Sequence, residues 1–492
     1  MNWDYSNIMK LFSDHGSGEL LLAGNWGLEK ESLRVSPSGQ LSLSPHPQAF
    51  GDKINNPHIT VDFSESQVEL ITPVLQSIEE THDFLCRLHS FVEESIGDEM
   101  LWPMSMPGSL PSEDQIPLAD YGDHEKGREK EIYRSGLALR YGKKMQMISG
   151  IHYNFSFSDS FWEFLHGKIG QENDLRSFKD EMYLNLTRNF LKFRWLLIYL
   201  FGASPLGTEA YMSEFLTKNE CVCDKAGCKR TFENPVQFAT SLRMSRFGYE
   251  NSYQDLLKVS YNSLESYIGE IRRALGQEID QYTDLGIFKN GEQVQMNGNL
   301  LQSENEYYAP VRLKRIPKKN KSMLAELAED GIEYLEFRIF DLDPFQRTGI
   351  SLQQMYFIHV FLLYCCLNRL EDLTQDDMNR FSDNAQLAAL FGRSEQLKLM
   401  LDDKNKVSIR GWSQELFGQL RDIATLLDSH GSSDKFQKSV AEQARKLENI
   451  EFLPSSTIVN IMNFNGDSHE GFGLDRAVQN LGERLPAAVE AC

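Results

Sequence analysis

The stretch QMISGIHYNFSF, residues 146–157, alternates polar and apolar side chains with a period of two. Because successive side chains of a β-strand point to opposite faces, this pattern predicts a strand. The apolar face would carry Ile151, Tyr153, Phe155 and Phe157. The polar face would carry Gln146, His152, Asn154 and Ser156.

Three other stretches alternate in the same way and place acidic side chains on one face. In GLEKESLRV (27–35), Glu29 and Glu31 share a face. In TVDFSESQVELITP (60–73), regular pairing puts Glu65, Gln67 and Glu69 on one face and Val68, Leu70 and Thr72 on the other. In GIEYLEFRIFDLDPF (331–345), Glu336 and Arg338 share a face with Ile332, Tyr334 and Phe340. Four alternating strands, three of them with acidic side chains on one face, therefore predict an antiparallel sheet whose polar face has a special role.

An ordinary solvated face explains any one of these strands. The solvated-face explanation fits the four strands together less well. Such a face should carry Lys and Thr, whereas these faces carry mostly Glu with one His, one Asn and one Arg. Converging carboxylates raise one another's pKa or require a cation. Oxygen ligands suit Mg²⁺, and a lone His shifts the preference toward Mn²⁺. The chain contains neither the phosphate-binding loop G-x-x-x-x-G-K-[ST] nor the dinucleotide-binding motif G-x-G-x-x-G. A nucleotide would therefore be held through a metal ion. The pattern predicts a metal-dependent site on a sheet face that acts on phosphate.

Around these strands the chain shows helical periodicity. Ser77 followed by Glu80 is a capping-box signature ahead of a helix over 77–99, and a polar, proline-containing loop follows over 103–127. Further helices are predicted over 180–201, 353–370, 414–427 and 436–447, and further strands around 293–301 and 332–341. We see no internal repeat and no long linker. We expect one α+β unit, with a sheet region over 1–345 and a helical part over 346–492 packed on it.

Composition excludes several classes of protein. The 492 residues include 50 Lys+Arg and 71 Asp+Glu, for a net charge of −21, which is the wrong sign for a nucleic-acid binder. The start of the chain lacks a secretory h-region, and the apolar stretches 195–201 and 355–367 are shorter than the roughly 18–20 residues of a membrane span, so we expect a cytoplasmic protein with buried helices there. Cys221, Cys223 and Cys228 lack the paired spacing of a structural zinc site, and we expect a surface loop.

Taken together, eight motifs in order resemble the glutamate–cysteine ligase family of the proteobacterial type. They are GLEKESLRV (27–35), TVDFSESQVELITPV (60–74), LWPMSMP (101–107), SGIHYNFS (149–156), YLFGASP (199–205), ATSLRMS (239–245), SENEYYAP (303–310) and GIEYLEFRIFDLDPF (331–345). The resemblance implies a curved antiparallel sheet that forms a funnel-like site, as in glutamine synthetase. It also implies flanking helices and a helical C-terminal part.

The resemblance assigns roles residue by residue. It implies a metal-ligand set of Glu29, Glu31, Asp62, Glu69, His152 and Glu336. It places Arg338 against the transferring phosphoryl group and Arg243 on the glutamate substrate. It implies a cysteine pocket of Phe63, Tyr133, Leu137, Gln146, Asn154, Tyr249 and Tyr308. Glu65 and Gln67 receive no family role. Without the resemblance, each aromatic would be read as a core residue, and Arg338 as an ion-pair partner of Asp341 or Asp343.

The activity implied is the ATP-dependent ligation of glutamate to cysteine through a γ-glutamyl phosphate, with Mg²⁺ and ATP required, as the first step of glutathione synthesis. Feedback inhibition by glutathione and a monomeric state are also expected. The segment CVCDKAGC (221–228) has no counterpart that we can align, and the second, glycine-adding domain of bifunctional relatives is not expected. Two alternatives stay open: a γ-glutamyl ligase for another amine, and a non-catalytic metal- or nucleotide-binding relative.

Overall fold

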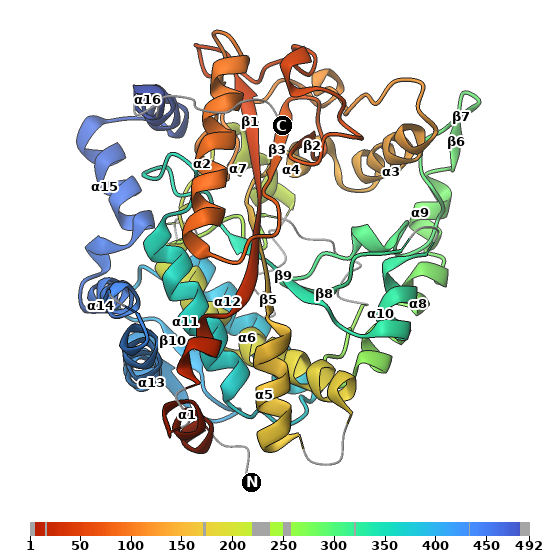
Figure 1. The fold of residues 1–492 in the computed structure, drawn as a ribbon. Coiled ribbons are helices and arrows are strands. Elements are labelled where there is room, and N and C mark those ends of the chain that lie inside the picture. Colours follow the sequence, from red (N-terminus) through yellow and green to blue (C-terminus); the bar gives the residue numbers. More distant parts are fainter. Residues whose placement is uncertain are drawn as a thin grey trace.

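The computed structural model describes residues 5–14, 17–170, 174–218, 237–248, 257–318, 321–431 and 433–482. Its centre is an open antiparallel sheet in the order β2-β3-β1-β5-β9-β8, with β4 paired to β1 (Figure 1). The strands of this sheet are β1 (Gly24–Val35), β2 (Ile59–Val61), β3 (Gln67–Ile71), β4 (Met100–Leu101), β5 (Ile151–Phe157), β8 (Val311–Lys314) and β9 (Tyr334–Phe340). Two short hairpins lie elsewhere, β6–β7 (Phe288–Lys289, Glu292–Gln293) and β10–β11 (Lys398–Met400, Lys406–Ser408).

Helices flank the sheet on both sides. In Figure 1, α2, α11 and the C-terminal helices lie on one side of the strands, and α3, α8, α9 and α10 lie on the other. Those of the first two thirds are α1 (Tyr5–Asp14), α2 (Ile78–Ser95), α3 (Glu125–Tyr141), α4 (Lys143–Gln146), α5 (Asp159–Ile169), α6 (Leu175–Phe201), α7 (Glu209–Lys218), α8 (Leu264–Gly276), α9 (Asp280–Asp284) and α10 (Met323–Asp330). The later ones are α11 (Leu352–Leu367), α12 (Gln375–Phe391), α13 (Ile409–Ser429), α14 (Lys435–Glu448), α15 (Pro454–Asn465) and α16 (His469–Gly482).

Strand register confirms the alternation predicted for β1, β5 and β9. Glu31 lies opposite Glu69 on β3, Glu29 lies opposite His152 on β5, and Glu336 is paired with Asn154. The same register puts Tyr153 and Phe155 on the opposite face, in the main hydrophobic cluster with α6 and α11. The apolar face is therefore sealed by helices, and the polar face is left for a site.

A β-bulge interrupts the regular pattern near the end of β9. Tyr153 pairs with Phe337, but Ile151 pairs with Phe340, so β9 has one more residue than β5 over this interval. The extra residue turns Phe340 onto the apolar face, where its ring packs 6.0 Å from that of Tyr153. The expectation that Phe340 shares a face with Glu336 is therefore wrong.

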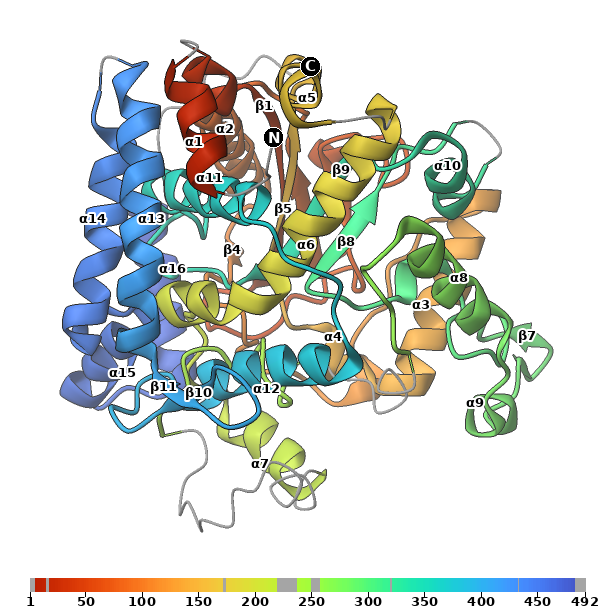
Figure 2. The same cartoon turned by 90° about the horizontal axis from the view of Figure 1, so that it is seen from below.

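α11, α13 and α14 pack onto the sheet region through one continuous core, whereas α15 and α16 pack in a second hydrophobic cluster with the end of β1. α11 is buried on nearly all sides, and its residues share a hydrophobic cluster with β5, β9, α6, α13 and α14. Figure 2 shows α13 and α14 side by side at one end of the molecule, with α11 between them and the strands. The α+β class, the antiparallel sheet and the helical C-terminal part are confirmed, and a domain boundary at residue 345 stays a prediction.

Several predicted elements differ in detail. Residues 294–301 form no strand, and only the two-residue β7 precedes them. The strand predicted over 146–157 begins only at Ile151, and Gln146 lies in the helical turn α4. At the start of α2, Ser77 accepts a hydrogen bond from the Glu80 amide, which is half of the predicted capping box. No helix among the described residues is long and apolar enough to cross a membrane.

Asn185 on α6 provides a test of the core. Its fully buried amide donates to the carbonyls of Cys366 (3.0 Å) and Asn368 (2.8 Å) and accepts from the Leu370 amide (2.9 Å), at the C-terminal end of α11. Asn185→Ala leaves these groups with fewer partners, so we expect the free energy of unfolding to fall by about 1–3 kcal/mol. Chemical denaturation measures the loss. The exposed Asn379→Ala on α12 is the control and should change stability by less than about 0.5 kcal/mol.

Candidate active site

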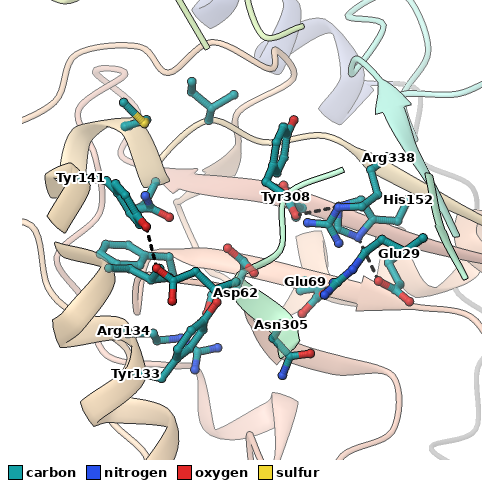
Figure 3. A pocket seen from close by; sticks show the side chains of 18 of the residues that line it. Glu29, Asp62, Glu69, Tyr133, Arg134, Tyr141, His152, Asn305, Tyr308 and Arg338 are labelled. Carbon is teal, nitrogen blue, oxygen red and sulfur yellow. Dashed lines mark hydrogen bonds and ion pairs between the residues drawn. The ribbon is translucent and has the colours of Figure 1, made fainter. Parts of the chain in front are cut away.

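A cavity of about 360 Å³ lies on the polar face of the sheet, between the strands, α3 and the segment 305–308. Figure 3 shows Glu29, His152 and Arg338 on one side of it and Tyr133, Arg134 and Tyr141 on the other. Most of the predicted site residues line this cavity. They are Glu29, Glu31, Asp62, Phe63, Glu69, Tyr133, Leu137, Gln146, His152, Arg243, Tyr308, Glu336 and Arg338.

Two predicted site residues are not in that lining. Asn154 lies on β5 and donates a hydrogen bond of 2.9 Å to Glu29 Oε1, so it contacts a predicted metal ligand on the sheet. Tyr249 lies outside the described residues. Gln146 reaches the cavity from the turn α4, although it was predicted on the strand.

The centre of the polar face is a cluster of one histidine and several carboxylates. Ligand atoms of Glu29, His152 and Glu336 all lie within 4.8 Å of one another. His152 Nδ1 is 3.0 Å from Glu29 Oε2 and 3.7 Å from Glu336 Oε1, and His152 Nε2 is 3.5 Å from Glu31 Oε1. Adjacent strands bring these side chains together, because each occupies the same face at neighbouring register positions.

The two halves of this cluster differ electrostatically. Burial raises the pKa of Glu69 well above its usual value, and the charges of Glu29, Asp62 and Glu31 raise it further. Burial and the charge of Asp62 likewise raise the pKa of Glu31. The carboxylates on the β3 side of the cavity therefore repel one another.

Glu336 has the opposite environment. Burial opposes its ionisation, but the charges of Arg338, Lys314 and Arg312 outweigh burial and lower its pKa. For Glu29, burial is likewise outweighed, chiefly by the hydrogen bond with His152, and the pKa is lowered. Both side chains are thus held as carboxylates.

This donor set fits a hard divalent cation. Glu336 Oε2 is buried and has no hydrogen-bond partner within the described part of the chain, and the Glu69 side of the cluster carries excess negative charge. Carboxylate oxygens with a single imidazole are ligands that Mg²⁺ and Mn²⁺ accept.

Basic residues from two other elements also enter the cavity, and sequence reasoning missed them. Arg312 and Lys314 come from the edge strand β8, with their side-chain nitrogens 3.8 and 3.6 Å from Glu336 Oε2. Lys130 and Arg134 come from α3. The alternation in VRLK (311–314) was the available signal for the first pair. Met145, Ile148, Tyr141, Asn305 and Glu306 complete the lining.

Glu306 fixes the wall opposite the sheet. It accepts a hydrogen bond of 2.6 Å from the Tyr141 hydroxyl and one of 3.2 Å from Arg140 Nη1. Arg140 also donates to the carbonyls of Asn297 and Asn299. The segment that carries Tyr308 is thereby tied to the helix that carries Tyr133.

The two arginines predicted to contact substrate, Arg338 and Arg243, have different partners in the protein. Arg338 Nη1 is 3.1 Å from Glu336 Oε1, and its guanidinium lies 5.8 Å from the Tyr308 ring centre. Arg243 donates a hydrogen bond of 3.0 Å to the Arg338 carbonyl. Its guanidinium lies so close to Gly150 that a Cβ there would be 2.2 Å from Nη2. Asp341, considered above as a partner of Arg338, lies beside Arg243 instead, at 3.9 Å.

Glu65 does not share the face of Glu69, so that expectation is wrong. A turn precedes β3, which begins at Gln67, and Glu65 points away to pair with Lys53 at 2.7 Å. Gln67 is buried and donates to the Ile148 carbonyl and the Ser149 hydroxyl, both at 3.3 Å. Neither residue lines the cavity in the described part of the chain.

Comparison with known proteins gives consistent results. The family model described as glutamate–cysteine ligase matches residues 9–388. A relative named glutamate–cysteine ligase from Clostridium acetobutylicum is 46% identical over 481 residues, which cover 97% of this chain and 100% of the relative. One of the same name from Pseudomonas syringae pv. syringae is 40% identical over 449 residues, which cover 91% of this chain and 83% of the relative.

Solved structures agree. A glutamate–cysteine ligase from Francisella tularensis in complex with AMP has a TM-score of 0.83 and 31% identity, covering 95% of this chain and 90% of that chain. A bifunctional glutathione synthetase from Pasteurella multocida has a TM-score of 0.75 and 28% identity, covering 97% of this chain and 55% of that chain. With one family model across most of its length and relatives of one name over nearly all of it, this chain belongs to the glutamate–cysteine ligase family.

Proposed function

We propose that this chain joins the γ-carboxylate of L-glutamate to the amine of L-cysteine with consumption of ATP, giving γ-glutamylcysteine, ADP and phosphate. This reaction is the first step of glutathione biosynthesis. The observation that carries the proposal is the convergence of Glu29, His152, Glu336 and Arg338 in one cavity of a chain of this family. A carboxylate cluster beside an arginine fork suits phosphoryl transfer.

The chemistry requires activation of glutamate. A carboxylate does not react with an amine, so its γ-carboxylate oxygen first attacks the γ-phosphorus of ATP and ADP leaves. The cysteine amine then attacks the acyl carbon of γ-glutamyl phosphate, loses a proton, and phosphate leaves. Arg338 donates to the equatorial oxygens of the transferring group, and Arg312 and Lys314 neutralise charge beside it.

Glu29, Glu31, Asp62, Glu69, His152 and Glu336 would hold divalent cations, with Mg²⁺ as the expected ion and Mn²⁺ as a substitute. Such ions neutralise the phosphate charge that these carboxylates alone would repel. Without metal, the same carboxylates would keep ATP out of the cavity. Five of these six residues lie on β1, β3, β5 and β9, and Asp62 follows β2. We infer that their spacing suits phosphates that they would bind through the cations.

We assign the remaining wall to cysteine. Phe63, Tyr133, Leu137, Gln146 and Tyr308 line the cavity, and Asn154 contacts Glu29 beside it. Tyr249 keeps the role that the resemblance implies. Feedback inhibition by glutathione, a monomeric state and a cytoplasmic location stay predictions from the sequence.

The reaction is tested by incubating the purified chain with ATP, Mg²⁺, glutamate and a panel of amino acids and amines, and by measuring ADP and the ligated product. We expect ADP release with cysteine and γ-glutamylcysteine in equal amount. Formation of AMP and pyrophosphate would contradict the mechanism. Faster turnover with another amine would reassign the acceptor, and no turnover with any amine would favour a binding protein.

The two halves of the carboxylate cluster predict different responses to neutralisation. Glu69→Gln and Glu336→Gln should each lower kcat by about 10²-fold or more, because each removes charge that balances a cation. Without metal, only Glu69→Gln should raise the melting temperature, since Glu69 is repelled by three carboxylates whereas Glu336 is paired with three cations. Calorimetry in EDTA measures this difference, and equal shifts for both variants would contradict the charge assignment.

Arg338→Lys keeps the charge but loses the bidentate fork. We expect kcat to fall by roughly 10²–10⁴-fold, with the KM for ATP changed by less than about tenfold, because the lost contact forms mainly in the transition state. Arg347→Lys is the control, since Arg347 forms a buried structural pair with Glu93 on the other face of the sheet. The control should lower the melting temperature with kcat nearly unchanged. The same behaviour in Arg338→Lys would make Arg338 a structural residue.

Gly150 tests the position of the Arg243 guanidinium. A methyl group at residue 150 would displace this flexible end of the arginine side chain, so we expect Gly150→Ala to raise the KM for glutamate about tenfold with little loss of stability. Gly167→Ala on α5 meets open space and should leave every KM unchanged. A normal glutamate KM in Gly150→Ala would place glutamate away from Arg243.

A further inference from the structure

A buried carboxylate at the end of β9 joins three segments that are far apart in sequence. Asp341 is 2% exposed. Its Oδ2 accepts hydrogen bonds from the Ala203 amide (2.9 Å) and the Ser204 hydroxyl (2.7 Å), and its Oδ1 accepts one from the Ser241 hydroxyl (3.0 Å). These contacts tie the end of the sheet to the loop after α6 and to the segment 239–245.

The two serines pass this constraint to the backbone of Arg243. Because each hydroxyl donates its hydrogen to Asp341, its oxygen remains free to accept. Ser204 Oγ accepts from the Arg243 amide at 3.3 Å, and Ser241 Oγ accepts from the Met244 amide at 3.2 Å. The carboxylate thereby orients both hydroxyls and fixes the main chain on either side of the Arg243 Cα.

Asp341 also acts on the side chain of Arg243. Its Oδ1 lies 3.9 Å from Arg243 Nη1, while Nη2 donates to the Arg338 carbonyl at 3.0 Å. Gly150 lies against the guanidinium from the side of the sheet. Among the described residues, Arg243 lines the cavity and Asp341 does not. Asp341 is thus placed behind the arginine, where it contacts no substrate.

We propose that Asp341 is the positioning residue for glutamate recognition, holding Arg243 at the cavity wall through the ion pair and through the Ser204 and Ser241 hydroxyls. The proposal rests on the proposed function and on the role that the family resemblance implies for Arg243, which is to bind the glutamate substrate. An arginine binds a carboxylate with both nitrogens only in a narrow range of geometries. Loosening the contacts that hold Arg243 should therefore weaken the binding of glutamate and leave the binding of ATP unchanged.

The test is steady-state kinetics of Asp341→Asn with Asp343→Asn as the matched control. The side-chain NH₂ of the new asparagine is a donor and would face groups that themselves donate, the Ser204 and Ser241 hydroxyls and the Ala203 backbone amide. The substitution also removes the negative charge beside Arg243. We expect the KM for glutamate to rise roughly tenfold to hundredfold and the KM for ATP to change less than about threefold. Asp343 lies two residues along and accepts from the Phe345 amide, so its variant should keep both KM values. An equal rise of both KM values in Asp341→Asn, or none, would overturn the proposal.

A double-mutant cycle shows whether Asp341 acts through Arg243. In an Arg243→Ala background, Asp341→Asn should raise the glutamate KM by less than about twofold further, because the residue that it positions is gone. A full additional tenfold rise would overturn the proposal. If Arg243→Ala alone leaves the glutamate KM unchanged, the proposed role of Arg243 fails instead. Wild-type turnover with glutamate tests the function separately.

Ser241→Ala covers the case in which Asp341→Asn does not fold. It keeps the carboxylate and removes one of the two hydroxyls that support the Arg243 backbone. We expect a rise of about two- to tenfold in the glutamate KM, with the ATP KM unchanged. An unchanged glutamate KM in this folded variant would overturn the proposal.

Discussion

One cavity receives four glutamates from neighbouring strands: Glu29, Glu31, Glu69 and Glu336. Their carboxylates repel one another, and the other charged groups of the site must compensate for this repulsion. The strands cannot relax apart, because the opposite face of the sheet is sealed by α6 and α11. Packing on one face therefore holds charge together on the other. The burial that makes the sheet stable also removes the water that would screen these charges.

The charges that surround these carboxylates differ from one edge of the sheet to the other. Toward β8, Arg312, Lys314 and Arg338 surround Glu336 and lower its pKa. Toward β3, carboxylates face carboxylates and the pKa of Glu69 rises. The polar face thus changes from acidic to basic from one edge to the other. A polyanion with bound cations has charges that match both edges, because its cations can face the carboxylates near β3 and its anionic groups can face the basic residues near β8.

Periodicity alone was sufficient to find the centre of the site. Glu29, Glu31, His152, Glu336 and Arg338 were found because side chains alternate along a strand and adjacent antiparallel strands share a face. The family resemblance added Asp62 and two cavity residues of α3, Tyr133 and Leu137, whose helical spacing shows no sheet face. The apolar stretches 195–201 and 355–367 were predicted correctly as parts of buried helices, since a run of large apolar side chains is stable only away from water.

What the sequence could not reveal depends on contacts between distant segments or on irregular backbone. Arg312 and Lys314 were missed because the alternation in β8 covers only four residues, and its place beside β9 depends on pairing between distant segments. Glu65 was misplaced because a turn delays the start of β3, and Phe340 because a bulge shifts β9. The run 294–301 has the polar and apolar alternation of a strand, but it pairs through only one isolated bridge among the described residues, between Asn299 and Glu278.

The bulge in β9 also determines where this strand can change in length. With one residue fewer between Phe337 and Phe340, β9 and β5 would match in length over this interval, so Phe340 would stay opposite Ile151 on the apolar face. A deletion in the regularly paired part of the strand would instead move the side chains on one side of it to the opposite face of the sheet. Among descendants of this chain, deletions within β9 should therefore collect at the bulge and be purged from the regularly paired residues.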